Sequence, residues 1–174
     1  MKHVLPFLLL LWPAALASEE AEPIVATDKP GSVALTMRLE GYLARTVDDD
    51  GTPVIESGVG GTNFSIRFFG CTDNKDCSAA MLIASFDTPK GISLETVNAW
   101  NETEVFGRAY VDSECDAYFE HVIIGDPEMG QEVFLRILDH WDHYLHAFRR
   151  HIRFDDEDTA DMSLETSDGA SQAL

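Results

Sequence analysis

Basic residues are scarce in this sequence. Its 174 residues include 12 Lys and Arg against 31 Asp and Glu, which gives a formal net charge of −19 at pH 7. A surface with such an excess of negative charge repels phosphate backbones and anionic lipid head groups. We therefore do not expect nucleic acid as a partner.

The sequence also lacks the common catalytic motifs. It contains no P-loop, no GxGxxG, no GxSxG and no HExxH pattern. We accordingly predict a protein that is not an enzyme and that uses no cofactor. A hydrolase of an unrecognised type remains an alternative, because its site would show only as a concave group of shifted acids or nucleophiles.

The one long apolar run lies at the N-terminus, in residues 4–12. Lys2 precedes it, and residues 15–17 (Ala-Leu-Ala) have the small-x-small pattern that signal peptidase cleaves. The run is shorter than the ~20 apolar residues of a transmembrane helix, and acidic residues follow it from Glu19 onward. We predict that residues 1–17 are a signal peptide and that the mature chain is periplasmic or secreted, with no membrane anchor.

Polar segments lie on both sides of the central part of the chain. Residues 18–29 are predicted to be a linker. The last twenty residues carry seven acids and no base, so we predict that residues 155–174 form an acidic disordered tail. This tail could serve as a solubilising extension or could dock on a basic partner. Residues 30–154 are then one domain.

The hydrophobic pattern of that domain predicts an α+β fold with the order α-β-β-β-β-α-β-β-α. Pro30 fits the start of a first helix that stops at Gly41, and Ser93 can cap a second helix that runs to about Thr103. The strands are expected near residues 42–47, 53–57, 63–71, 79–86, 107–112 and 117–124, and the last helix near residues 128–152. Residues 79–86 are apolar on both faces, which favours a central strand that other elements cover.

The last helix holds four of the six histidines. Asp139, His143 and His146 stand at i, i+4 and i+7, so a single metal ion could reach all three. Cations at Arg136 and Arg150 flank them and oppose a bound dication. We therefore interpret the group as a solvated helix face with His143 and His146 on the far side from the sheet. A periplasmic metal-binding protein is the alternative.

The three cysteines separate into a close pair and a single residue. Five residues lie between Cys71 and Cys77, at the neck of a predicted hairpin, and we predict a disulfide between them in an oxidising compartment. Two free thiols are the alternative. Cys115 is left over in an acidic turn whose carboxylates raise the pKa of a thiol, so we expect it to be inert.

Two segments carry a resemblance to a known family. They are GTPVIESGVGGTNFSIRFFGCTDNKDC at 51–77 and SLETVNAWNETEVFGRAYVD at 93–112, and a long amphipathic helix follows them. Together they resemble the YbjN family of bacterial proteins over about residues 30–152. The most specific block consists of Trp100, Asn101, Phe106, Gly107, Arg108, Ala109 and Tyr110.

The resemblance implies a twisted antiparallel sheet packed by helices, similar to that of type III secretion chaperones, and a role in sensory transduction. It supplies no catalytic residues. Within the shared block, Trp100 and Phe106 are expected to pack the second helix on the sheet, and Gly107 to permit a tight turn into the strand. Arg108 and Tyr110 are expected to share one face of the strand, opposite to Ala109 and Val111. Two roles are open for them, which are contacts within their own fold or a surface that binds a partner.

We therefore expect a non-enzymatic regulator or chaperone-like module of the periplasm. Its partner would be a protein that binds an exposed sheet face or a helix groove, and a homodimer is one arrangement that fits. This expectation rests on analogy with a family and not on a site, because the sequence shows no catalytic group of residues.

Overall fold

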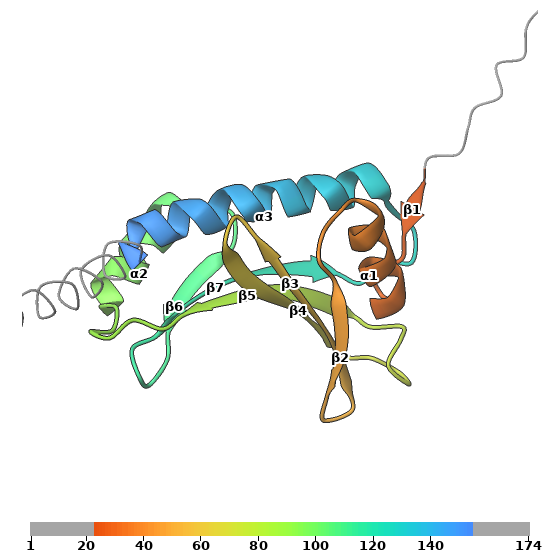
Figure 1. Ribbon diagram of the computed structural model, residues 1–174, viewed down its shortest axis with the longest axis horizontal. Helices are drawn as coiled ribbons and strands as arrows, with labels where there is room; N and C mark the ends of the chain where they lie inside the picture. Colours follow the sequence, from red (N-terminus) through yellow and green to blue (C-terminus); the bar gives the residue numbers. More distant parts are fainter. Residues whose placement is uncertain (1–22, 155–174) are drawn as a thin grey trace, which may run out of the picture.

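The computed structural model describes residues 23–154, which fold into an α+β domain (Figure 1). The predicted order of elements is confirmed, and two strands of two residues each are added to it, β1 and β8. The predicted signal peptide (1–17) and acidic tail (155–174) lie outside the described residues. The elements are β1 (Ile24–Val25), α1 (Pro30–Leu39), β2 (Arg45–Asp49), β3 (Thr52–Val59), β4 (Thr62–Phe69), β5 (Ala79–Phe86), α2 (Leu94–Thr103), β6 (Arg108–Val111), β7 (Ala117–Ile124), β8 (Met129–Gly130) and α3 (Gln131–His151).

Six of the strands form one antiparallel sheet in the order β2-β3-β4-β5-β7-β6. Strands β2, β3 and β4 each pair with the next strand along the chain. Strand β7 then pairs with β5, and β6 comes last, so the α2–β6 segment lies at the outer edge. The sheet is strongly twisted, and the β2–β3 hairpin projects away from α3 in Figure 1.

Strands β1 and β8 form a separate two-stranded sheet, in which Val25 pairs with Met129. Val25 is fully buried, so this part of the predicted linker belongs to the packed domain. The pairing also explains why α3 begins at Gln131 and not near Glu128 as predicted, because Met129 and Gly130 are already used in the strand.

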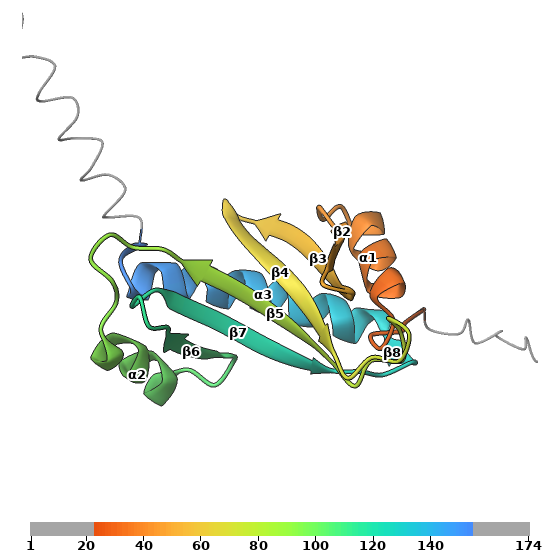
Figure 2. The same cartoon turned by 90° about the horizontal axis from the view of Figure 1, so that it is seen from below.

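Helix α3 covers one face of the six-stranded sheet along its whole length (Figures 1 and 2). Its apolar residues recur every three or four positions, which places them on one side of a helix. Five of them are buried, namely Phe134, Leu138, Trp141, Leu145 and Phe148. Every second residue of the strands packs against them, and in β4 these residues are Phe64, Ile66 and Phe68.

Aromatic rings join α3 to the sheet. Phe119 of β7 stacks on Trp141 and on Phe148, with 5.2 Å between ring centroids in both pairs. Trp100 of α2 meets Phe148 edge-on at 5.2 Å and Phe119 at 5.7 Å. The predicted role of Trp100 is confirmed, since it packs α2 against both the sheet and α3.

Helix α2 begins and ends as its sequence predicts. The Ser93 hydroxyl accepts a hydrogen bond from the Thr96 N–H, which caps the first turn. After the helix, Gly107 adopts φ +74°, and a Cβ atom there would lie 2.7 Å from the Phe119 ring and 2.8 Å from the Glu120 carbonyl oxygen. Only glycine fits this close approach without strain.

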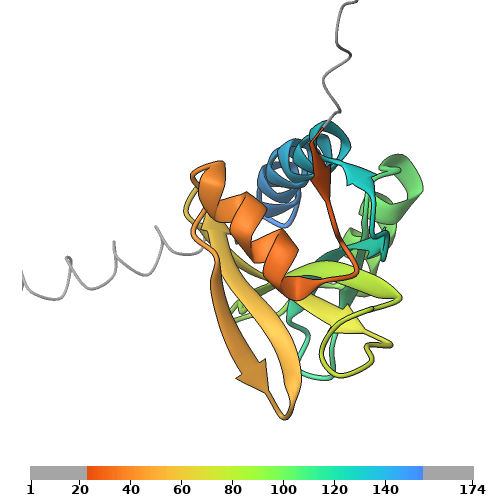
Figure 3. The same ribbon diagram turned by 90° about the vertical axis from the view of Figure 1, so that its right-hand side faces the viewer.

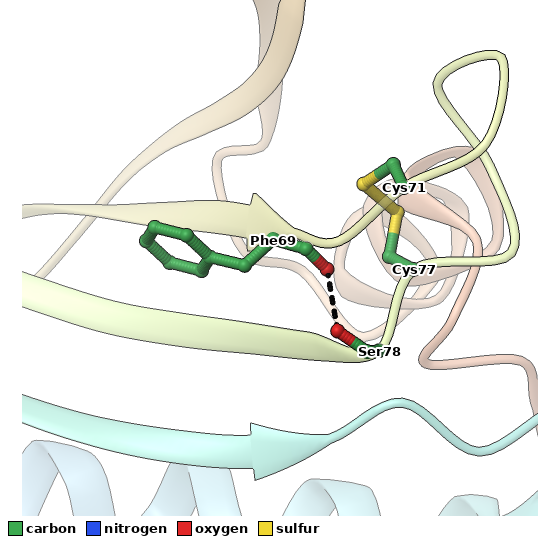
Figure 4. Close-up of a disulfide and its surroundings, with 4 residues drawn as sticks. All are labelled: Phe69, Cys71, Cys77 and Ser78. Atoms are coloured by element: carbon green, nitrogen blue, oxygen red, sulfur yellow. Dashed lines mark hydrogen bonds between the residues drawn. A yellow bond between two sulfur atoms is a disulfide. The ribbon is translucent and has the colours of Figure 1, made fainter.

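The predicted disulfide is present between Cys71 and Cys77, in the loop that joins β4 to β5 (Figure 4). At the neck of this loop the Ser78 hydroxyl donates to the Phe69 carbonyl oxygen at 3.1 Å. The Cys77 N–H donates to the Asp28 carbonyl oxygen at 2.8 Å. The loop is therefore tied to the segment before α1, and α1 itself lies beside β2 and β3 (Figure 3).

Strand β5 has bounds identical to those predicted, but the expectation that both of its faces are covered is wrong. Ala80, Leu82, Ala84 and Phe86 are buried under α3. Met81 and Ile83 point to the other face and are only partly buried, because no helix of residues 23–154 lies over that face. In the same stretch of chain, no helix has the length and apolar character needed to cross a membrane.

Candidate functional site: the open face of the sheet

On the face of the sheet opposite α3, side chains from several strands converge, and we call this surface the open face. In Figure 2, strands β4, β5 and β7 lie in front of α3 with nothing drawn over them. Strand register places Ser65 opposite Ile83, and Ile83 opposite Glu120. The open face consists of Arg45, Glu56, Ser65, Arg67, Phe69, Met81, Ile83, Ser85, Tyr110, Tyr118, Glu120, Val122 and Ile124.

Two adjoining hollows of about 520 Å³ and 540 Å³ mark the open face. Ser65, Ile83 and Ser85 line both hollows, so the two share a wall formed by β4 and β5. The second hollow also has Phe69 and Met81 in its wall. Apolar side chains next to serine and arginine form the mixed lining that small ligand sites and protein interfaces share.

Two tyrosines close the second hollow on the side of β6 and β7. The Tyr110 and Tyr118 rings stack with 5.0 Å between centroids and 7° between planes. Burial raises the pKa of Tyr110, and the nearby Glu120 raises it further. Burial also raises the pKa of Tyr118, with a second contribution from Asp112. Both hydroxyls therefore stay protonated at neutral pH and can donate hydrogen bonds.

Arg108 lies at the border of this surface and makes two contacts within its own fold. It forms an ion pair with Glu120 on the neighbouring strand, and its guanidinium lies 5.8 Å from the centre of the Tyr110 ring. The Glu120 side chain is 3% exposed, whereas that of Arg108 is 73% exposed. Arg108 therefore makes contacts within its own fold, and enough of its side chain is exposed for a partner to contact it.

The predicted metal ligands are placed on α3 but do not converge. Among the described residues, the one group of three whose ligand atoms lie within 4.8 Å of one another is Asp112, Glu114 and Asp116. Asp139, His143 and His146 do not form such a group. The His146 ring packs against the β3–β4 turn, where a Cβ on Gly60 would lie 1.9 Å from its Nε2. The prediction that His146 faces the far side is therefore wrong.

That contact arises because the β3–β4 turn reaches over to α3. The Arg149 Nη1 group donates to the Thr62 hydroxyl at 2.7 Å, and His146 Nε2 lies 3.3 Å from Asp142. A helical wheel of α3 alone cannot show this, because the turn comes from a segment about 85 residues earlier in the chain. Cys115 is free, as predicted, and its side chain is exposed.

His121 occupies a partly buried aromatic pocket on the α3 side of the sheet. Its ring stacks on Phe106 at 3.8 Å, and Phe106 in turn contacts Tyr144 at 5.1 Å and His140 at 5.7 Å. Burial lowers the pKa of His121, and the nearby His140 lowers it further. These contacts show that Phe106, in the segment after α2, packs against β7 and α3.

A comparison with protein families gives a match to the part of the chain that builds this sheet. The profile of the YbjN family, described as "Putative bacterial sensory transduction regulator", matches residues 30–154. The match covers well over half of the 174 residues. The chain belongs to the YbjN family. No curated protein matches the chain. The residues that match the YbjN profile therefore include the open face, the tyrosine pair and the disulfide.

Sequence reasoning placed Arg108 and Tyr110 on a shared face but missed the centre of the open face. Phe69, Met81 and Ile83 gave no separate signal, because an apolar residue in a central strand is usually covered. A usable signal was present in β4, where Ser65 and Arg67 alternate with buried residues. Polar residues at these positions indicate that this side of the sheet faces water.

We predict that Arg108→Ala lowers the free energy of unfolding by about 1–3 kcal/mol, because it leaves the buried Glu120 carboxylate without its ion-pair partner. Urea denaturation measures this change. The variant Arg108→Ala/Glu120→Gln removes the buried charge together with its partner, and we expect it to recover at least half of the lost stability. Equal losses in the single and double variants would contradict the assigned ion pair.

We also predict that stability falls as the pH is lowered through about 6.5, the ordinary pKa of histidine. His121 binds a proton less readily in the folded state than in the unfolded state, so its contribution is complete above that pH and decreases below it. Urea denaturation between about pH 7.5 and pH 5.5 tests this. In His121→Phe, which keeps an aromatic ring against Phe106, this part of the pH profile should become flatter. An unchanged slope would contradict the prediction.

Proposed function

We propose that this YbjN protein is an exported, non-enzymatic regulatory module of the periplasm that binds a protein partner through its open face. The observation that carries the proposal is a six-stranded sheet with one face packed under α3 and the other face hollowed and partly apolar. Export is supported by the apolar N-terminal run in the sequence and by the Cys71–Cys77 disulfide, a bond typical of oxidising compartments.

The chemistry of the open face favours binding over catalysis. Two of its arginines are paired with carboxylates of other strands, Arg45 with Glu56 on the neighbouring strand and Arg67 with Asp49 two strands away. Asp112, which also lines the second hollow, accepts hydrogen bonds from the backbone N–H groups of Glu114 and Asp116. Tyr110, Tyr118 and Phe69 instead provide rigid aromatic area, which is the kind of side chain enriched at protein interfaces.

In this proposal Arg108 and Tyr110 belong to the border of the binding surface. Arg108 is already oriented by Glu120 and by the Tyr110 ring, so a partner would not have to order it. Pre-ordered side chains of this kind lower the entropy cost of association. The same contacts hold the fold together, and a test of the binding role has to compare proteins of matched stability.

The proposal predicts that one partner is lost when the centre of the open face is changed. In-cell crosslinking of the tagged protein, followed by affinity capture and quantitative mass spectrometry, measures partner recovery. For Phe69→Ala/Ile83→Thr we expect at least about a tenfold drop, because two central apolar contacts disappear. Leu39→Ala is the matched control, since Leu39 is 76% exposed on α1, away from the open face.

The control variant and the melting temperatures distinguish the loss of a binding surface from the loss of the folded structure. Leu39→Ala should recover the partner like the unchanged protein, and melting temperatures should show that all variants are folded. Recovery of the same partner in equal amount with Phe69→Ala/Ile83→Thr would overturn the proposal. Arg108→Ala, compared at a temperature of equal stability, then reports whether the border of the surface contributes to binding.

A further inference from the structure

The two edges of the six-stranded sheet are protected to different extents. Strand β2 forms one edge and carries charges at Arg45, Asp48 and Asp49, which discourage pairing with another strand. At the opposite edge, the Asn101 side chain of α2 covers β6. Its amide nitrogen donates to the Ala109 carbonyl oxygen at 2.9 Å, and its amide oxygen accepts from the Ala109 N–H at 2.9 Å.

This cap on Ala109 fixes the direction of every backbone group in β6 and β7. Because the N–H and C=O of Ala109 point to α2, those of Arg108 and Tyr110 point to β7. Their partners Glu120 and Tyr118 therefore point to β6. The direction of the backbone N–H and C=O groups alternates along a strand with a period of two. The groups of Val122 and Ile124 therefore point to the same side as those of Tyr118 and Glu120.

Strand β6 begins at Arg108, opposite Glu120, so it does not extend alongside Val122 and Ile124. Within residues 23–154, no strand pairs with this part of β7 on the side away from β5. The Thr27 hydroxyl donates to the Ile124 carbonyl oxygen at 3.0 Å. The N–H and C=O of Val122 and the N–H of Ile124 remain as a short free edge.

The side chains at this free edge are apolar and exposed. Val122 is 51% exposed and Ile124 is 70% exposed, and both lie on the open face beside Met81 and Ala79. A hollow of about 310 Å³ adjoins the edge and is lined by Val105, Gly107, His121, Val122 and the Arg108–Glu120 ion pair, whose opposite charges offset each other. No charged residue occupies Val122 or Ile124, so the protection found in β2 is missing here.

Charge indicates which kind of strand would be accepted. Glu104 precedes the segment that lines the hollow, and Asp126 and Glu128 follow the end of β7. The whole chain carries a formal charge of −19, so a second copy would bring further negative charge to the same place. An extended segment with basic residues at its ends complements these carboxylates.

We propose that the free edge of β7 at Val122 and Ile124 binds an extended segment of a partner protein, apolar at alternate positions and flanked by basic residues. The segment pairs with the backbone of β7 as an added strand. Its apolar side chains continue the open face beyond Val122 and Ile124. This inference rests on the proposed function and names the conformation and charge of the partner.

A synthetic probe tests the pairing directly. The probe is a fluorescein-labelled decapeptide of alternating threonine and valine with two lysines at each end, titrated with the full chain and followed by fluorescence anisotropy. We expect saturable binding, and at least about tenfold weaker binding of the same peptide with glutamates in place of the lysines. Equal or tighter binding of the glutamate peptide would overturn the charge assignment.

Backbone methylation of the probe leaves the protein unchanged. One peptide is N-methylated at its valines and another at its threonines, so that each loses the N–H groups of one side of a strand. We expect one of the two to bind at least about tenfold more weakly and the other to keep its affinity, since only one side faces β7. Equal affinity of the two peptides would overturn strand pairing.

Variants of the chain locate the pairing at β7. Val122→Pro removes an N–H that faces away from β5, a position where an edge strand tolerates proline, and it should weaken probe binding at least about tenfold. Val122→Thr keeps the N–H and the β-branched shape and should bind like the unchanged chain. Unchanged binding to Val122→Pro would overturn the proposal.

Two further results would also overturn this inference. One is the absence of saturable probe binding. The other is a concentration-dependent dimer, seen by sedimentation, that Val122→Pro dissociates and Val122→Thr does not, because a second copy would then be the occupant. In either case a partner lost with Phe69→Ala/Ile83→Thr would still support the open face, so the two proposals fail separately.

Discussion

The packing of α3 along one face of the sheet is the contact on which the rest of the structure depends. Phe134, Leu138, Trp141, Leu145 and Phe148 are all at most 1% exposed, and burial of each large apolar side chain contributes about 1.5–3 kcal/mol. The stacked pairs that Phe119 makes with Trp141 and Phe148 add about 0.5–1.5 kcal/mol each. A single long helix thus supplies five large side chains to the core, and the strands beneath it supply the facing residues.

The same constraint creates the open face. Helix α3 lies on one side of the sheet, while α1 and α2 lie beside the sheet near its two edges (Figures 2 and 3). Met81, Ile83 and Phe69 are therefore left partly in water even though they belong to central strands. A sheet that is stable with only one covered face can offer the other to a partner without unfolding, which suits a regulator of the YbjN family.

Regular elements were predictable from the sequence because their signals are local. Strands β5 and β7 have the predicted bounds, and the Ser93 cap and the glycine turn at Gly107 are where the residue types require them. The two-residue strands β1 and β8 were not predictable, since two residues show no periodicity. Their existence depends on a pairing between Val25 and Met129, which are far apart in the chain.

The candidate site was predictable only in part. Alternation shows which residues share a face, as Arg108 and Tyr110 do, but it does not show whether another element covers that face. The free edge of β7 depends on where β6 begins and on the long-range bond from Thr27 to Ile124. His146 was misplaced for the same reason, because a turn from a distant hairpin packs against it.

Hydroxyl-radical footprinting of the purified protein tests the central claim, a sheet with one covered face and one open face. Met81, Tyr110 and Tyr118 should be oxidised rapidly in the free protein, while Trp141 and Phe148 should react slowly because α3 and the sheet enclose them. The open-face residues should then become protected when the partner binds. Slow oxidation of Met81, Tyr110 and Tyr118 in the free monomer would show that the face is covered and would contradict the account.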